Sequence, residues 1–168
     1  MFVKRDRKTR SHGLPANWQG NTSLTTFFEK VKDRLSPKRA KVPHTYKDEL
    51  WSFEIQNPDN KNLVFKPAKD TAISDIDISY DGERVMFSSV DDNSQWNIDE
   101  YNVKTGKVKE LSPRLFPDID NYDGCYLPDG KIIYCSSATF VGVPCVAGTD
   151  YVPNLFIMNP NAGTPEQV

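Results

Sequence analysis

The chain has 168 residues with a formal net charge of −2, and its 38% hydrophobic and 26% charged residues are typical of one soluble globular domain. No apolar run approaches the ~18 residues of a transmembrane helix, and the N-terminal sequence MFVKRDRKTR has no apolar core. We therefore predict neither a membrane span nor a signal peptide in this chain, and the presence of only two histidines excludes most histidine-based metal and catalytic sites.

Charge is distributed unevenly along the chain. Residues 1–47 contain 12 Lys or Arg and 3 Asp or Glu, whereas the remaining residues contain 9 and 20. Such a basic segment is usually solvated or lies against acidic parts of the same chain, and the alternative is an anion-binding module over residues 4–41, including Lys38, Arg39 and Lys41. Because no nucleic-acid-binding motif accompanies the charge, we predict no nucleic-acid partner.

Residues 1–67 indicate an incomplete structural unit with an insertion. Residues 1–3 have the composition of a strand end, and residues 50–65 are typical of a strand, a polar turn and a second strand. Between them, the sequence TFFE has a capping-box pattern and predicts a short helix near residues 26–35. This helix would lie in a basic insertion, residues 24–45.

Residues 68–113 indicate a four-stranded antiparallel unit. Ile76 and Ile78 alternate with polar residues as in a half-buried strand, and a turn at Asp81 and Gly82 follows. The apolar run VMF then predicts a central strand that is buried on both faces. Another alternating run, a Lys-Thr-Gly-Lys hairpin turn and a short closing strand complete the unit.

Residues 114–168 repeat this unit. The sequence DGERVMFSS recurs as DGKIIYCSS at an offset of 48 residues, with a matching turn at Asp129 and Gly130. The closing segments IDEYNVKTGKVKEL and LFIMNPNAGTPEQV match at an offset of 57. The second offset is nine residues longer than the first, which places nine extra residues in a long insertion loop, residues 138–153.

Four short strands per unit, at a period of about 40–50 residues, are typical of a β-propeller blade. We therefore predict an all-β fold, a partial β-propeller with two full four-stranded blades, part of a third and the short inserted helix. Propellers close with about four to eight blades, so the ring does not close within this chain. The chain is then either a fragment of a longer propeller or a protein whose open sheet edges favour self-association.

Three segments resemble the propeller-bearing middle region of the hydrazine synthase alpha subunit family: SHGLPANWQGN, DIDISYDGERVMFSS and DIDNYDGCYLPDGKIIYCSSATFVGVPCVAG. The blades also resemble the WD40-like repeats of the Tol-associated (TolB-like) periplasmic propeller. The resemblance implies a propeller of six to eight blades in a larger exported bacterial protein, located in the periplasm or outside the cell. Covalent haem, which hydrazine synthase carries, needs a C-x-x-C-H motif that this sequence lacks, so we predict no cofactor.

The resemblance also bears on the three cysteines. Relatives often carry Cys where this chain has Thr139, which leaves Cys135 as the nearest partner for Cys145. A Cys135–Cys145 disulfide would close the insertion loop, and three free thiols are the alternative. Cys125 is interpreted as a small buried apolar residue, because no base accompanies it as a nucleophile would require.

Two loops are candidate binding sites, and the sequence contains no catalytic constellation. The first carries a Trp that would stack on a sugar or on a partner side chain, unless it covers the propeller itself. The second is the apolar insertion loop, which either contacts a partner or packs at the mouth of the blade. The candidate residues are Asn17, Trp18, Gln19, Phe140, Val143 and Pro144.

Asp118, Asp120 and Asp123 are weak metal candidates. Their spacing departs from that of a calcium-binding loop, as does the spacing over residues 75–81, so we predict no metal site. The alternative interpretation is that these aspartates cap turns and protect strand edges.

We predict a non-catalytic propeller scaffold that binds a protein or glycan partner through its inter-strand loops, or that packs on other blades of the same protein. One alternative is the propeller domain of a haem-dependent oxidoreductase of the hydrazine synthase type. Another is the propeller domain of a hydrolase or lyase whose catalytic groups lie on other segments.

Overall fold

The computed structural model describes residues 1–5, 47–91, 95–113, 119–139, 141, 152–161 and 164–168. The helix predicted near residues 26–35 and the basic insertion lie outside this part of the chain. Within it every regular element is a β-strand. The same residues contain no helix long and apolar enough to cross a membrane.

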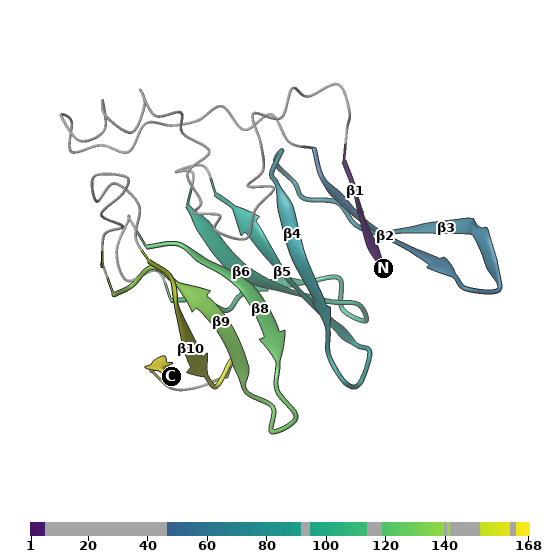
Figure 1. Ribbon diagram of the computed structural model, residues 1–168. Helices are drawn as coiled ribbons and strands as arrows, with labels where there is room; N and C mark the ends of the chain where they lie inside the picture. Colours follow the sequence, from purple (N-terminus) through teal and green to yellow (C-terminus); the bar gives the residue numbers. More distant parts are fainter. Residues whose placement is uncertain (6–46, 92–94, 114–118, 140, 142–151, 162–163) are drawn as a thin grey trace.

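The strands form three antiparallel sheets in which each strand pairs with its neighbour along the chain (Figure 1). We name them sheet A (β1–β3), sheet B (β4–β7) and sheet C (β8–β11). The bounds are β1 Phe2–Lys4, β2 Glu49–Glu54, β3 Asn57–Phe65, β4 Ile73–Ile78, β5 Arg84–Val90, β6 Trp96–Asn102, β7 Val108–Glu110, β8 Asn121–Tyr126, β9 Ile132–Ser136, β10 Asn154–Met158 and β11 Glu166–Gln167.

This arrangement confirms the all-β partial propeller. Sheets B and C each contain four strands in chain order, and sheet A contains three. The sequence offsets are reproduced, because β5 matches β9 at 48 residues and β6 matches β10 at 57. Gly82 and Gly130 have φ of 73° and 84°, which glycine adopts without steric cost, in the turns that join the first two strands of sheets B and C.

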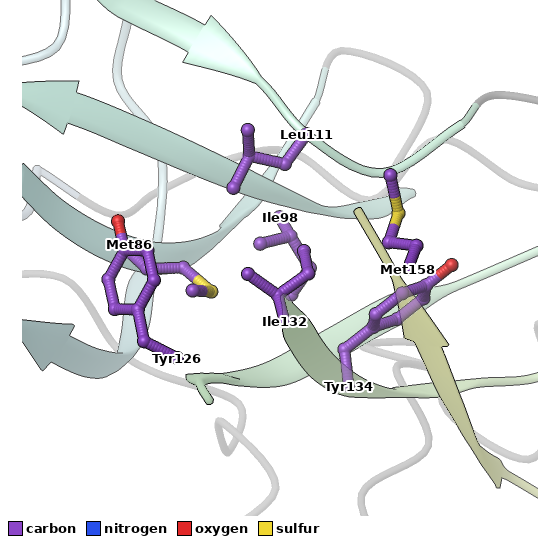
Figure 2. Close-up of a cluster of buried hydrophobic side chains, with 7 residues drawn as sticks. All are labelled: Met86, Ile98, Leu111, Tyr126, Ile132, Tyr134 and Met158. Atoms are coloured by element: carbon purple, nitrogen blue, oxygen red, sulfur yellow. The ribbon is translucent and has the colours of Figure 1, made fainter. Parts of the chain in front are cut away.

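Sheet B lies between the other two sheets, and side chains alternate along β5 to reach both. Val85 and Phe87 pack against Leu50 of sheet A, whereas Met86 packs against Ile132 of sheet C (Figure 2). The three β5 residues are at most 2% exposed. The prediction of a strand buried on both faces is therefore confirmed.

Gly124 on β8 allows sheet C to approach sheet B closely. A Cβ atom at this position would lie 2.5 Å from the Met86 sulfur and 3.3 Å from two methyl carbons of Ile98. Both neighbours are fully buried and have no free volume into which to move.

We expect Gly124→Val to lower the free energy of unfolding by about 2 kcal/mol, because overpacking a filled interface forces strained rotamers and backbone shifts. Urea denaturation followed by fluorescence measures the change. Gly124→Ala should lower the free energy of unfolding by less than Gly124→Val does. Equal stability of both variants and the parent would show that the interface between sheets B and C contains unfilled volume.

Candidate functional site

Two aspartates 48 residues apart occupy the same place in neighbouring sheets. Asp75 lies on β4 and Asp123 on β8, the first strands of sheets B and C, with φ of 52° and 56°. This left-handed backbone region is uncommon for residues other than glycine. The pairing of each strand with its neighbour shifts register at these aspartates, so each one marks a β-bulge. The bulge is part of the repeat.

The bulge corrects the predicted alternation on the first strand. Ile78 is exposed and Ser79 is buried, the reverse of the pattern expected from a regular strand. The extra residue in the bulge changes which face the following side chains occupy. Asp77, beyond the bulge, instead turns toward sheet C and accepts a hydrogen bond of 2.7 Å from the backbone N–H of Tyr126.

The bulges bring acidic groups close to one another. Partial burial, and then the negative charge of Asp75, raise the pKa of Asp123. Burial likewise raises the pKa of Cys135 and of Tyr122, and Asp123 and Asp75 add to both shifts. Asp123, Cys135 and Tyr122 therefore favour their protonated forms. Raised pKa values at a strained backbone are a recurring property of functional sites.

The pKa shift of Asp123 makes stability depend on pH in a defined direction. Its protonated form is favoured in the folded state, so its stabilising contribution is complete below pH 3.8 and is lost as the pH rises through the raised pKa. We expect Asp123→Asn to raise the urea midpoint at pH 7 and to leave it unchanged at pH 3, since Asn also tolerates left-handed backbone. Asp59→Asn, at an exposed position, is the control. An equal rise in the urea midpoint of this control would attribute the effect to net charge.

The remaining weak metal candidates are Asp118 and Asp120. Asp118 lies outside the described residues. Asp120 is buried and accepts a hydrogen bond of 3.0 Å from the backbone N–H of Trp96, and its own N–H donates to Ser137 Oγ at 2.8 Å. It joins sheet B to sheet C. In the part of the chain that the structure describes, no three His, Cys, Asp or Glu side chains are placed to share a metal ion.

The cysteines differ from the prediction in one respect. Cys125 is exposed on β8, not buried, and it follows directly after the β-bulge of that strand. Residual desolvation and the nearby Asp77 raise its pKa, which disfavours the thiolate. Cys135 is half-buried on β9. Cys145 lies outside the described residues, so the Cys135–Cys145 disulfide stays a prediction.

The predicted binding-loop residues also lie outside the described part of the chain. They are Asn17, Trp18, Gln19, Phe140, Val143 and Pro144. The turn residues are described: Asp81 accepts a hydrogen bond from the N–H of Glu83 at 2.9 Å, and Asp129 accepts one from Lys131 at 3.1 Å. These hydrogen bonds shape the turns of the two hairpins.

The structure reveals a cleft between sheets A and B that the sequence did not indicate. Its volume is about 370 Å³, and it is lined by the segment between β3 and β4 and by residues of β5, β6 and β7. The rings of Phe65 and Phe87, with centroids 5.7 Å apart, form an aromatic wall. The other described residues of the lining include the carboxylates of Asp70, Asp91 and Asp99 and the ammonium group of Lys69.

Hydrogen bonds hold the polar wall of this cleft. Ser89 Oγ donates to Asp99 across the β5–β6 pair at 2.5 Å. Thr71 Oγ1 donates to the carbonyl of Val90 at 2.6 Å, which attaches the segment between β3 and β4 to the end of β5. The cleft thus has a fixed outline, because its wall residues belong to paired strands or bond to them.

No known protein-family model matches the sequence, and no curated protein matches it. Among solved structures, the chain is similar to TolB from Acinetobacter baumannii (TM-score 0.54, 14% identity, covering 72% of this chain and 26% of that one). It is also similar to a putative TolB from Agrobacterium tumefaciens (TM-score 0.54, 16% identity, covering 76% of this chain and 39% of that one). A third similar structure is puromycin hydrolase (TM-score 0.54, 14% identity, covering 77% of this chain and 20% of that one). The chain therefore spans 20–39% of the length of these proteins.

These similarities concern the fold. They support a TolB-like β-propeller arrangement of the sheets and agree with the partial propeller seen here. They do not support the finer resemblance to the hydrazine synthase alpha subunit. Puromycin hydrolase shows that a similar arrangement of sheets also occurs in a hydrolase.

Proposed function

We propose that the chain is a non-catalytic propeller scaffold that binds a partner protein in the cleft between sheets A and B. The observation that carries the proposal is the cleft itself, whose volume of about 370 Å³ lies in the range of ligand-binding sites. By analogy with the TolB-like fold, the scaffold would belong to a larger exported protein.

The lining of the cleft favours a basic side chain as the group that enters it. The aliphatic stem of Lys or Arg packs well on an aromatic wall, and its cationic head suits the carboxylates at the rim. Among the described residues that line the cleft, Asp70, Asp91 and Asp99 are acidic and Lys69 is basic, and Asp91, Asp99 and Lys69 also take part in further polar interactions. The Lys47 ammonium nitrogen lies 3.6 Å from Asp70 Oδ2 at the surface, and this ion pair offsets part of the negative charge of Asp70. A glycan would gain less from these charges.

Fluorescence anisotropy with labelled peptides tests the proposal. An octapeptide of alternating Lys and Ser should bind, and its Glu–Ser counterpart should not, with affinity falling as salt rises. The variant Asp91→Asn/Asp99→Asn should weaken binding by about tenfold or more, and Asp59→Asn, on the exposed part of β3, is the matched control. Equal binding by both variants, or binding of a chito-oligosaccharide in place of the basic peptide, would contradict the proposal.

A further inference from the structure

A second cavity lies between sheets B and C, at the same strand positions as the cleft between sheets A and B. The cleft is lined by Phe87 of β5 and by Asp99, its partner on β6. The second cavity is lined by Tyr134 of β9 and by Phe156, its partner on β10. Its volume is about 80 Å³, and we name it the B–C cavity. The repeat thus places a cavity at both interfaces between the described sheets, with different side chains in each.

Most of the described lining of the B–C cavity is apolar. The rings of Tyr134 and Phe156, with centroids 6.2 Å apart, form an aromatic wall. None of the described lining residues is charged, whereas the cleft between sheets A and B is lined by several carboxylates. The other apolar members of the described lining are Pro113, Ile119, Ala138 and Pro165.

One buried side chain on this lining has an amide nitrogen without a partner. Asn121 is 2% exposed, and its Nδ2 has no hydrogen-bond partner among the described residues. Ser136, paired with Asn121 across β8 and β9, is equally buried, and its Oγ accepts a hydrogen bond of 3.2 Å from the N–H of Ala138. The last torsion of an asparagine side chain is broad, so a small rotation turns Nδ2 toward a group in the cavity. Because an unpaired buried donor is costly, Asn121 indicates a ligand that supplies an acceptor.

The chemistry of the lining restricts the group that enters. A carboxylate or an ammonium group would lose its hydration without meeting an opposite charge on the described lining. A hydrocarbon would leave the amide of Asn121 unpaired. Water at roughly 30 Å³ per molecule would need more than one molecule to fill the cavity, and the rings and prolines offer such waters few partners. A neutral group with a polar tip and an apolar stem satisfies all of these conditions.

We propose that the B–C cavity binds the carboxamide side chain of an Asn or Gln residue of a partner protein. The ligand carbonyl accepts a hydrogen bond from Asn121 Nδ2, and the ligand amide donates to the second lone pair of Ser136 Oγ. The methylene stem packs on the rings of Tyr134 and Phe156. An N-acetyl group is less suitable because it ends in a methyl group, whereas the buried side of the cavity carries Asn121 and Ser136 and the exposed side carries Thr164.

NMR titration of the ¹⁵N-labelled 168-residue chain with propionamide, which ends in the same group as a glutamine side chain, tests the proposal. We expect saturable shifts of the side-chain N–H resonances of Asn121 and of the backbone amides of Ser136 and Ala138. A dissociation constant in the millimolar range suits a ligand of so few atoms. Propionate and propylammonium, which are charged and of similar size, should cause no such shifts. Absence of saturable shifts with propionamide, or equal shifts with propionate, would overturn the proposal.

Two variants should remove the binding by different routes. Asn121→Leu removes the amide and should weaken propionamide binding by about tenfold or more, and it should raise the urea midpoint of the ligand-free chain because an unpaired buried donor is gone. Ala138→Leu fills the cavity, keeps Asn121 and should weaken binding as much. Asn62→Leu, on the exposed part of β3, is the matched control and should bind as the parent does. Circular dichroism checks the fold of each variant, and Ala138→Leu decides the outcome if Asn121→Leu does not fold.

Further measurements separate this proposal from its alternatives. N-acetylglucosamine should leave the resonances of Asn121 unchanged, and saturable binding of the sugar that Asn121→Leu abolishes would overturn the proposal. Propionamide binding that persists in Asn121→Leu would mean apolar contact alone and would overturn it as well. Asp91→Asn/Asp99→Asn, which alters the cleft between sheets A and B, should leave propionamide binding unchanged. Carboxamide binding therefore stands or falls separately from the proposed function.

Discussion

Replacing Ile132 with alanine is expected to lower the free energy of unfolding by about 3 kcal/mol, because the change removes buried methyl groups and leaves a cavity between two sheets. Ile132 has no exposed surface and lies at the centre of the cluster that joins sheets B and C, against Met86 and Ile98 (Figure 2). These neighbours come from paired strands of sheet B and do not collapse readily into the space.

Chemical denaturation of the parent and of Ile132→Ala at equal concentration measures this loss. The matched control is Ile55→Ala, the same chemical change in the β2–β3 turn, where the isoleucine is 89% exposed. The control should stay within about 0.5 kcal/mol of the parent. If both variants lost the same small amount, sheets B and C would not share a packed core.

The second large effect is expected at Asp48, whose side chain is fully buried between sheets A and B. Its carboxylate accepts hydrogen bonds from Arg5 Nε and Nη2 at 2.9 and 2.6 Å and from the backbone N–H of Ile73 at 2.9 Å. One side chain therefore connects the segment after β1, the start of β2 and the start of β4. Asp48→Ala removes an acceptor for several donors and should cost about 3–4 kcal/mol.

A double-mutant cycle identifies the source of that loss. If the ion pair accounts for it, Arg5→Ala/Asp48→Ala should be more stable than the sum of the two single changes allows, with a coupling energy of about 1–3 kcal/mol. Asp59→Ala, at an exposed aspartate of β3, controls for the loss of a carboxylate. Additive losses in the cycle would show that the contact to Ile73, and not the one to Arg5, carries the stabilisation.

The sequence predicted the fold where its signal was local. The VMF run, the Asp-Gly turns and the recurrence of DGERVMFSS as DGKIIYCSS depend on residues within a few positions of one another, and each appears in the structure as expected. Strand order also followed, because each strand pairs with its neighbour along the chain. A blade is a local structure, so local patterns are enough to identify it.

The candidate site was less accessible from the sequence. The cleft brings Asp70, Asp99 and Val108 together from three separate segments, and no spacing in the sequence encodes that contact. The bulge aspartates had a usable signal, since Asp75 and Asp123 align at the 48-residue offset of the repeat. A strictly alternating strand was assumed there instead. The same assumption led to the wrong burial for Ile78.

Because sheet B is packed on both sides and each end sheet on one, the stack resembles a short repeat array in its energetics. Loss of an end sheet breaks one contact surface, whereas loss of the middle sheet breaks two and leaves the end sheets with no core to share. Amide hydrogens of β5 should therefore exchange with solvent last, and those of β3 and β11 first. In a closed ring every sheet would be packed on both sides, and the difference in amide exchange rate between the middle sheet and the end sheets would disappear. The exchange rates of the backbone amides therefore report whether sheets A and C each have an uncovered face.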